Sequence, residues 1–367
     1  MLIARSVHPL PGEAERKERL LTLVYGFSSR RLLIVGDLIA DEFIYGDVSR
    51  MSREAPVLIL KYDATEILPG GAGNAANNVA ALGGRARVAG VVGTDAESQR
   101  LLKSFHRSVD RSFIIRDKSY LTPVKTRILA GGVHAARQQI VRIDRESGPV
   151  PEKLADAVLK RVRKLVGECD GVLLSDYGSG LVTAKLADAV RRAVAERSRR
   201  RPVPVVVDSR YRLLDYRGFT TCTPNESEVE QVLGVHVGDD LKALERAGRL
   251  LLKKTRMKGV LITRGSRGMA LFEPKQPTVH IPIFGSGEVA DVTGAGDTVI
   301  ATFGLALAAG ASLYEAARLS NYAGGLVVKK RGTATVSAEE LAAAVVSDHD
   351  AAVENWSQEG PAQGRRS

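Results

Sequence analysis

Short runs of apolar residues alternate along the chain with longer segments in which apolar residues recur every three or four positions. The short runs predict buried β-strands, and the longer segments predict amphipathic helices. The predicted strands are 32–36, 87–92, 171–175, 203–208, 220–223 and 259–263. The predicted helices are 13–24, 72–82, 96–105, 152–166, 183–197, 241–253 and 298–309. Such alternation is typical of an α/β fold whose mostly parallel central sheet is flanked by helices on both faces.

Two stretches interrupt this alternation, at 43–63 and 113–144. Their β-branched residues and period of two predict a small sheet that is separate from the main one. Beside the strand ends of an α/β fold, such a sheet acts as a lid that excludes water, or it consists of edge hairpins without that role. Because an exposed small sheet can pair with a second copy, we expect a homodimer.

The domain organisation follows from these elements. We expect an N-terminal leader over 1–30, one α/β domain over 31–346 that includes the lid, and a flexible polar tail over 347–367. No apolar run approaches the roughly 20 residues that a membrane-spanning helix needs, and residues 1–31 lack the pattern of a secretory signal. The sequence therefore predicts a cytoplasmic protein without a membrane partner.

Composition adds a basic surface to this picture. The 367 residues carry a formal net charge of +11, but Lys and Arg are spread along the chain, so we expect no nucleic-acid partner. A basic surface also raises the local concentration of phosphorylated substrates. Cys169 and Cys222 lie far apart and outside any Cys/His cluster, which predicts neither a disulfide nor a zinc site.

The segment 291–297 reads Asp-Val-Thr-Gly-Ala-Gly-Asp and leads directly into the predicted helix 298–309. Glycines at a helix start let backbone N–H groups close around an anion, and the final carboxylate stands beside that anion. This pattern indicates transfer of a phosphoryl group to a hydroxyl, with Asp297 as the base that orients or deprotonates the alcohol. The alternative is a plain turn that is capped by Asp297.

Two further motifs suit a sugar. Asp37 and Asp41 follow the first predicted strand, where α/β proteins bind ligands, and carboxylates accept hydroxyl hydrogen bonds; either acid also suits a turn cap. The glycine-rich segment 70–74 precedes a helix and ends with Asn74, so that a sugar can approach the backbone. Its near-fit to the dinucleotide fingerprint is weak, because no clean buried strand precedes it.

Two other motifs suit a nucleotide. Asn225 and Glu228 lie three apart at a predicted helix start, which fits either a capping box or contacts to phosphate and to magnesium waters. The segment 263–268, Thr-Arg-Gly-Ser-Arg-Gly, follows a strand and forms either a cradle for nucleotide phosphates or a simple glycine-rich turn. The sequence has no P-loop and no protein-kinase motif pair.

Taken in order, these motifs resemble the ribokinase (PfkB) family of sugar kinases over about residues 31 to 345. The resemblance implies a ribokinase-like fold with a β-sheet lid. It also implies an enzyme that phosphorylates a sugar hydroxyl with ATP and Mg²⁺.

Within that family, the segments 46–57, 175–178 and 291–299 are similar to kinases of D-glycero-β-D-manno-heptose 7-phosphate. Those kinases phosphorylate the anomeric hydroxyl in the synthesis of ADP-heptose for lipopolysaccharide. The bifunctional forms add an adenylyltransferase with a His-x-Gly-His motif, which this sequence lacks, so we expect the kinase part alone. Two alternatives stay open: a family member acting on fructose 6-phosphate, ribose or a nucleoside, and a noncatalytic sugar-phosphate sensor or nucleic-acid binder.

The resemblance also assigns residues. It makes Asp297 the base, with Gly294, Ala295 and Gly296 as the anion hole. It implies sugar contacts from Asp37, Asp41, Gly70, Gly71, Asn74 and Asp176. It implies nucleotide contacts from Asn225, Glu228, Thr263, Arg264, Gly265, Gly268 and Asn321, with Glu228 holding Mg²⁺ through water. It implies a monovalent cation site, suited to K⁺, formed largely by carbonyls of Asp291, Thr293, Val327, Lys330, Gly332 and Thr335.

One departure from the family concerns positive charge near the phosphates. After Asp176-Tyr177-Gly178, relatives often have Lys-Gly, whereas this chain has Ser179 and Gly180. A cation is therefore missing there or is supplied from elsewhere. The candidates to bind the substrate's own phosphate are Arg50, Lys125, Arg127 and Arg142 on the predicted lid; the alternative is ordinary solvated strand charges.

Overall fold

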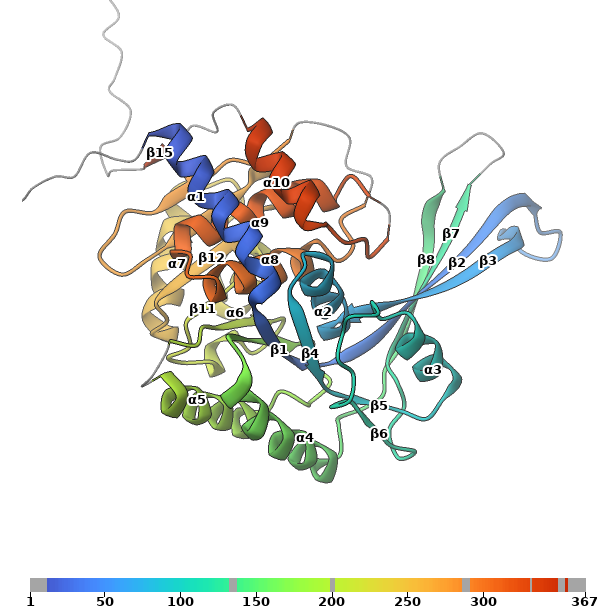
Figure 1. Cartoon of the computed structure of the whole chain (residues 1–367). Coiled ribbons are helices and arrows are strands. Elements are labelled where there is room, and N and C mark those ends of the chain that lie inside the picture. Colours follow the sequence, from blue (N-terminus) through green and yellow to red (C-terminus); the bar gives the residue numbers. More distant parts are fainter. Residues whose placement is uncertain are drawn as a thin grey trace, which may run out of the picture.

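A nine-stranded sheet forms the centre of the described molecule (Figure 1). The computed structural model describes residues 12–131, 137–198, 202–285, 291–330, 332–348 and 354–355. The strands, in spatial order, are β15 (Glu354–Asn355), β14 (Val279–Ile281), β13 (Met269–Phe272), β12 (Gly259–Thr263), β11 (Thr221–Cys222), β10 (Val205–Ser209), β9 (Gly171–Asp176), β1 (Arg31–Gly36) and β4 (Arg85–Ala89). Neighbours from β12 to β4 pair in parallel, and the pairings from β12 through β15 are antiparallel.

Helices cover both faces of this sheet (Figure 1). One face carries α1 (Glu13–Tyr25), α2 (Ala72–Ala81), α8 (Ala295–Ala308), α9 (Leu313–Val327) and α10 (Ala338–Ser347). The other carries α4 (Glu152–Leu165), α5 (Ala184–Ser198), α6 (Glu226–Leu233) and α7 (Leu241–Thr255). Leu32 and Ile34 of β1 join the first core, whereas Leu33 and Val35 join the second. Because successive strand side chains point to opposite faces, one apolar run serves two cores, and the predicted fold class is confirmed.

The remaining small elements lie around the body. Helix α3 (Ala96–Lys103) contacts the base of the second sheet, and short 3₁₀ turns lie at Gly26–Ser29, Val166–Glu168, Leu213–Asp215 and Gly265–Arg267. The prediction of a single strand over 87–92 is wrong, because Gly90 separates two strands, β4 and β5. Strand β5 (Val91–Val92) instead pairs with β6 (Ile115–Arg116) in a two-stranded sheet. A Cβ at Gly90 would lie 2.9 Å from the Gly36 carbonyl oxygen, so the backbone bends there against β1.

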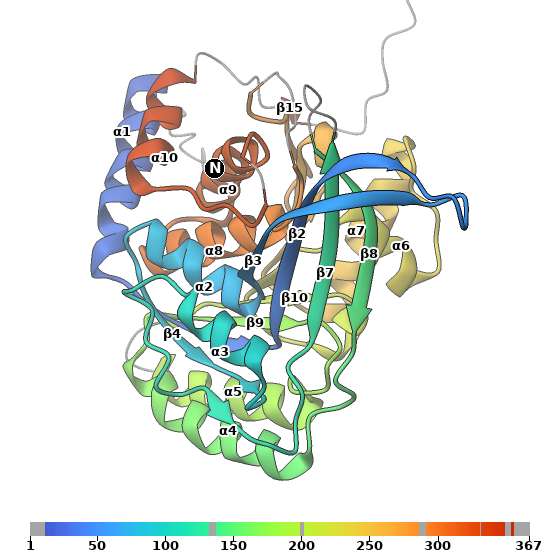
Figure 2. The same cartoon turned by 90° about the vertical axis from the view of Figure 1, so that its right-hand side faces the viewer.

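The second sheet is the predicted lid, and it projects from the body (Figure 2). It consists of β3 (Leu58–Gly71), β2 (Leu38–Met51), β7 (Val124–Gly131) and β8 (Gln138–Arg145), in that spatial order. The sheet differs from the expected segments 43–63 and 113–144 in two ways. Residues 38–42, of which 38–41 are buried, continue the pairing inward, and residues 113–123 lie outside this sheet. All residues of β8, an edge strand of this sheet, are exposed. The homodimer expected from this sheet stays a prediction.

The helix of the expected leader packs onto the domain. Leu20, Leu23 and Val24 of α1 are buried in the first core, and α1 contacts α10. Residues 13–29 therefore add to the body rather than precede it. Residues 1–11 of the leader and most of the predicted tail 347–367 lie outside the described residues.

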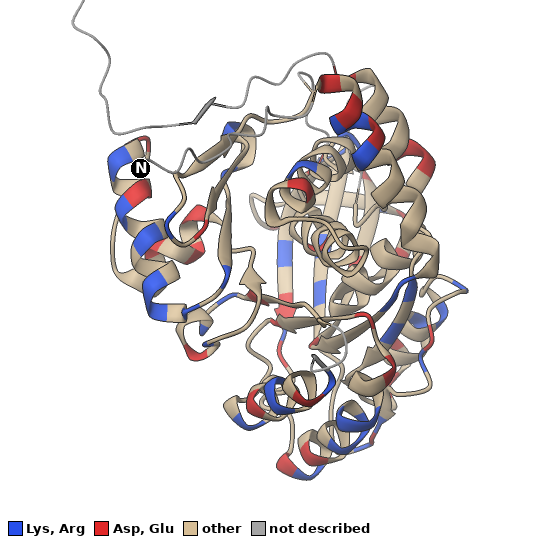
Figure 3. Cartoon of the chain, turned by 60° about the vertical axis from the view of Figure 1, so that its left-hand side comes forward, with Lys and Arg blue, Asp and Glu red and all other residues tan. Residues whose placement is uncertain are grey.

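Charged residues are distributed over the whole body. Basic and acidic positions are interspersed on the helices drawn in Figure 3, in keeping with a solvated surface. None of the described helices is long and apolar enough to cross a membrane.

The contact of α7 with β13 yields a stability prediction. Replacing Gly248 by Ala normally favours a helix by about 1 kcal/mol. Here the added Cβ would overlap the fully buried Phe272 ring. We therefore expect Gly248→Ala to lower the free energy of unfolding by about 1–3 kcal/mol, measured by urea denaturation.

Gly167→Ala is the matched control, because a Cβ at Gly167 meets nothing within 4 Å. It should leave the free energy of unfolding unchanged or raise it slightly. Equal midpoints for Gly248→Ala and the unmodified protein would contradict the packing argument.

Candidate active site

The site lies where the strand order reverses, at the carboxyl ends of β1 and β9. The chain passes from β1 to β4 on one side of the sheet and later returns to β9 on the other side of β1. Ligands of open α/β sheets bind at such a reversal. Gly36 ends β1 so close to Ser175 that a Cβ would overlap its backbone carbonyl. Asp37 and Tyr177, the residues that follow the two strands, are thereby brought together.

Asp297 lies in the first turn of α8 and is only 4% exposed. Asn74 Nδ2 donates to one carboxylate oxygen over 2.8 Å, and the Tyr177 hydroxyl donates to the other over 3.0 Å. Asn78 donates to Asn74 Oδ1 over 3.1 Å and accepts from the Thr298 hydroxyl over 2.9 Å. This network joins α2 to α8, so the structure places Asn74 beside the expected base.

Burial raises the pKa of Asp297 to about 7, even though the Asn74 and Tyr177 hydrogen bonds lower it. Repulsion from Asp41 raises this pKa further, and attraction to Lys125 lowers it. A carboxyl group with a pKa near 7 is an effective general base at neutral pH, because about half of it is ionised and the ionised form readily accepts a proton.

The helix start beside Asp297 provides donors for an anion. Gly294 adopts the left-handed conformation, with φ of 77°, and α8 begins at the next residue. The N–H groups of Gly296 and Asp297 have no hydrogen-bond partner among the residues that the structure describes. The Ala295 N–H is not available, because it donates to the Val292 carbonyl over 3.2 Å. The anion hole expected from Gly294, Ala295 and Gly296 would therefore use N–H groups other than that of Ala295.

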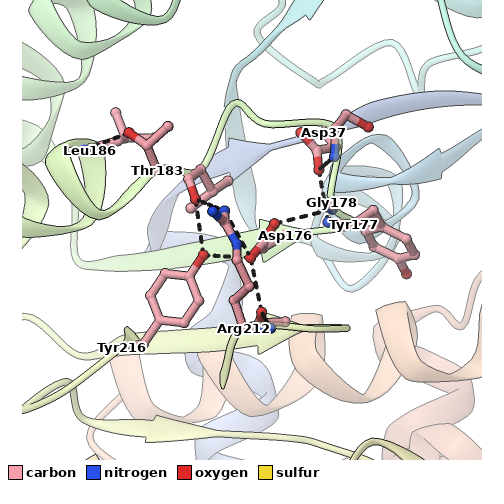
Figure 4. Close-up of polar contacts among 11 residues, drawn as sticks. Asp37, Asp176, Tyr177, Gly178, Thr183, Leu186, Arg212 and Tyr216 are labelled. Carbon is pink, nitrogen blue, oxygen red and sulfur yellow. Dashed lines mark hydrogen bonds and ion pairs between the residues drawn. The ribbon is translucent and has the colours of Figure 1, made fainter. Parts of the chain in front are cut away.

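Asp37 has one oxygen in use and one free (Figure 4). Its Oδ2 accepts from the Tyr177 and Ser179 N–H groups over 2.8 and 3.1 Å. Its Oδ1 is buried without a hydrogen-bond partner in the described structure, and burial raises the pKa of this carboxyl to about 6. A buried orphan acceptor is costly, so its orientation suits a ligand that brings an O–H donor.

Asp41 is paired rather than free. Arg127 Nη1 donates to Asp41 Oδ1 over 2.6 Å, and both side chains are largely buried. Asp41 thus neutralises the charge of Arg127, whose expected contact with a substrate phosphate stays a prediction. Gly70 gives Asp41 space, since a Cβ there would overlap Asp41 Oδ2, and Gly71 with φ of 55° lies against Tyr177. Both glycines therefore pack beside the candidate sugar residues.

Asp176 does not face a ligand, contrary to the sequence-based expectation (Figure 4). Its Oδ2 accepts from the Ser209 and Tyr216 hydroxyls over 2.9 and 2.6 Å, and Arg212 lies 3.5 Å away. Its Oδ1 accepts from the Gly178 N–H over 3.2 Å. With 2% of its surface exposed, Asp176 instead fixes the loop that presents Tyr177.

The expected nucleotide side contains an acid that sequence reasoning missed. Asn225 and Glu228 form a reciprocal capping box, each accepting from the other's N–H over 2.9 Å. Burial raises the pKa of Glu228, and it raises the pKa of Asp208 well above the ordinary range, with repulsion from Glu228 as the next cause. The two carboxyl groups therefore lie close enough to repel each other, while the described residues contain no group of three or more His, Cys, Asp or Glu side chains that could hold a metal ion. The position of Asp208 at the end of an apolar strand was the available signal.

Other expected nucleotide contacts are occupied within the protein. Arg264 is 8% exposed, and its Nε donates to Glu226 over 2.7 Å, so its expected contact with the nucleotide stays a prediction. Gly265 and Gly268 have φ of 56° and 77°, as a glycine-rich turn requires. The Thr263 N–H donates to the Pro224 carbonyl over 2.9 Å. Asn321 donates to the Pro282 carbonyl over 2.8 Å.

The expected monovalent cation ligands are brought together only in part. Asp291 accepts from the Thr293 and Gly332 N–H groups over 2.9 and 3.0 Å, which draws these segments close. The Lys330 N–H donates to the Val327 carbonyl over 2.9 Å. The Thr335 carbonyl accepts from the Lys330 ammonium over 2.7 Å, so a cation of the chain already uses this expected ligand.

The side chains expected to bind the substrate's phosphate differ in position: Arg50 lies far out on the lid, whereas Lys125 and Arg142 line a cavity at its base. Arg50 lies exposed on the distal part of β2 and donates to the Met51 carbonyl. Arg142 is held by Asp144 through two hydrogen bonds of 2.7 and 2.6 Å. Lys125 points toward the site, with its ammonium 5.1 Å from the Tyr177 ring centroid. Lys125 and Arg142 line a cavity of about 500 Å³ together with Tyr177, Ser179 and Arg210.

Comparison with known proteins agrees with this geometry. The model of the pfkB family of carbohydrate kinases matches residues 30–341. The Bifunctional protein HldE of Geobacter metallireducens is 44% identical over 329 residues, and that of Geobacter sulfurreducens is 42% identical over 333 residues. Each alignment covers 88% of this chain and 65% of the relative, so the chain spans about two thirds of the length of these curated relatives.

Solved structures share the fold at lower identity. Arabidopsis thaliana ribokinase, complexed with ribose and ATP, has a TM-score of 0.65 at 20% identity. Phosphofructokinase-2 from Escherichia coli, in complex with potassium, has a TM-score of 0.69 at 16% identity. Both alignments cover 86% of this chain and 98% of the other. From the family match and the site that its fold positions, the chain is a carbohydrate kinase and belongs to the pfkB family.

Proposed function

We propose that this kinase transfers the γ-phosphoryl group of ATP to the anomeric hydroxyl of D-glycero-β-D-manno-heptose 7-phosphate. The product is the 1,7-bisphosphate, an intermediate of ADP-heptose and lipopolysaccharide synthesis. The supporting observation is the buried Asp297 carboxyl, with a pKa raised by burial to about 7, beside the unpaired N–H groups of a helix start. The likeness to HldE proteins supports the choice of sugar.

The proposed reaction uses residues from both sides of the site. The sugar lies against the free oxygen of Asp37 and against Asn74. Asp297 accepts the proton of the anomeric O–H as that oxygen bonds to the γ-phosphorus. The bond from the γ-phosphorus to the β–γ bridging oxygen breaks, and ADP leaves. The N–H groups of Gly296 and Asp297 and the positive end of α8 stabilise the charge on the phosphoryl oxygens.

Metal ions enter this proposal through carboxylates and carbonyls. The repulsion between Asp208 and Glu228 fits a Mg²⁺ ion, which Glu228 would contact through water. When bound, Mg²⁺ neutralises charge on the nucleotide phosphates. A K⁺ ion at Asp291 and the carbonyls of Thr293, Val327, Lys330 and Gly332 would order the loop that carries Gly294.

A panel of acceptors tests the substrate. ADP release, measured by a coupled assay, should give the highest kcat/KM with heptose 7-phosphate. A higher value with fructose 6-phosphate, ribose or a nucleoside would identify a different acceptor. Absence of ADP release with every acceptor, combined with salt-sensitive DNA binding, would contradict the proposed catalysis.

Asp297→Asn tests the base. The amide keeps the size of the side chain but cannot take a proton, so kcat should fall by at least ~10²-fold while ATP binding, measured by calorimetry, persists. Asp188→Asn is the control, because this exposed carboxylate pairs only with Arg191 among the described contacts. Near-native turnover of Asp297→Asn would refute the assigned role.

The pH profile provides an independent test of the same carboxyl. Because the base must be ionised, kcat/KM should fall as pH drops through about 7. Tyr177→Phe removes an O–H donor that stabilises the carboxylate, which should move this limb to higher pH. Initial rates from pH ~5.5 to ~9 at saturating ATP measure both profiles. A limb that stays in place in Tyr177→Phe would assign the titration to another group.

A further inference from the structure

A cavity of about 500 Å³ lies at the base of the lid, and Tyr177, which bonds Asp297, is one of its lining residues. Its walls come from β7 and β8 of the lid, from the connection after β8, and from the loops that follow β9 and β10. The Tyr177 hydroxyl donates to Asp297, while the ring of Tyr177 lies beneath the Lys125 ammonium. Tyr177 therefore connects the lining of this cavity to Asp297.

The lining of the cavity has an excess of positive charge. It includes four basic side chains, Lys125, Arg142, Arg145 and Arg210, and two acidic ones, Asp144 and Glu146. Asp144 holds Arg142 through two hydrogen bonds, and Glu97 holds Arg145 over 3.0 Å. Lys125 and Arg210 have no ion pair in the described part of the chain, and Asp41, the carboxylate that attracts Lys125, is committed to Arg127.

The positive charges of Lys125 and Arg210 repel each other. Burial lowers the pKa of Lys125, and the repulsion by Arg210 and Arg142 lowers it further. Protein cations that are half-buried and close together are stable when an anion joins them. Arg210 is also positioned by its backbone, because its N–H donates to the Asp176 carbonyl over 3.0 Å. Its guanidinium lies 6.0 Å from the Tyr211 ring centroid.

We propose that Lys125 and Arg210 bind a phosphate monoester group of the acceptor sugar, and that Arg210 sets the preference for a phosphorylated acceptor. This inference rests on the proposed function, because it assumes that the other end of the same sugar presents its hydroxyl to Asp297. A guanidinium donates two parallel hydrogen bonds to a phosphate, which favours Arg210 as the discriminating group. The lid supplies Lys125 and the body supplies Arg210, so the anion joins the two parts.

A nucleotide phosphate is the other source of this chemistry. Arg210 lies near enough to Asp208 and Glu228 to lower the pKa of each carboxyl. The acceptor is favoured because the cavity is lined by Lys125 and the lid, and not by Asp208, Glu228 or the start of α8. The two sources predict different kinetic effects.

Arg210→Met is the test. It keeps most of the side-chain length and removes the charge. The KM for heptose 7-phosphate should rise by about tenfold or more, with kcat and the KM for ATP within about threefold of the unmodified enzyme. The kcat/KM for the dephosphorylated heptose should stay unchanged. Arg145→Gln is the matched control, because it removes a charge from the same cavity that Glu97 already neutralises, and it should change neither KM by more than about twofold.

Binding without turnover gives a second readout. Inorganic phosphate should compete with heptose 7-phosphate in calorimetry on the unmodified enzyme, and this competition should weaken in Arg210→Met. Arg210→Lys, which keeps the charge but loses the planar fork, should have an intermediate KM for the phosphorylated sugar. This conservative variant also serves if Arg210→Met does not fold.

The outcomes separate the two proposals. A raised KM for ATP with an unchanged KM for heptose 7-phosphate would assign Arg210 to the nucleotide and overturn this inference. Unchanged values for both substrates would overturn it as well. If the unmodified enzyme uses heptose 7-phosphate and the dephosphorylated heptose equally well, the proposed function itself fails in its choice of acceptor.

Discussion

The hydrogen bonds of the Asp297 carboxylate hold the site together. Two donors from different parts of the chain, Asn74 at the start of α2 and Tyr177 after β9, meet on one carboxylate at the start of α8. Burial alone would keep this group protonated, and the two donors counteract that effect. The same contacts fix the relative positions of three elements. The pKa of Asp297 and the relative positions of these elements therefore depend on the same two hydrogen bonds.

The sequence predicted most of the fold and the centre of the site, because both depend on local patterns. Buried parallel strands appear as apolar runs, and glycines before Asp297 mark a helix start that is open to an anion. The partners of charged residues were not predictable in this way. Whether Arg127 meets Asp41, or Arg264 meets Glu226, depends on side chains that are distant in sequence and become neighbours only after folding.

The same distinction explains which residues were missed. Tyr177 belongs to a motif that pointed to its neighbour Asp176, yet Asp176 is bonded within the protein and Tyr177 donates to Asp297. Asp208 lies in β10 and Arg210 directly follows this strand, and the groups that they act on, Glu228 and Lys125, belong to other elements. The interruption of the strand at Gly90 was equally hidden, because the close approach of Gly90 to Gly36 and Leu38 appears only in the folded chain.

The connections of the lid have a mechanical consequence. Asp37 is the single residue between the end of β1 and the start of β2, and β3 passes without an intervening residue into α2, which carries Asn74. A rotation of the two long strands must therefore turn the backbone at both sugar-facing side chains, since no slack separates them. Under the proposed function, Asp37 and Asn74 contact the sugar, so the binding of the sugar would be coupled through the backbone to a rotation of this sheet.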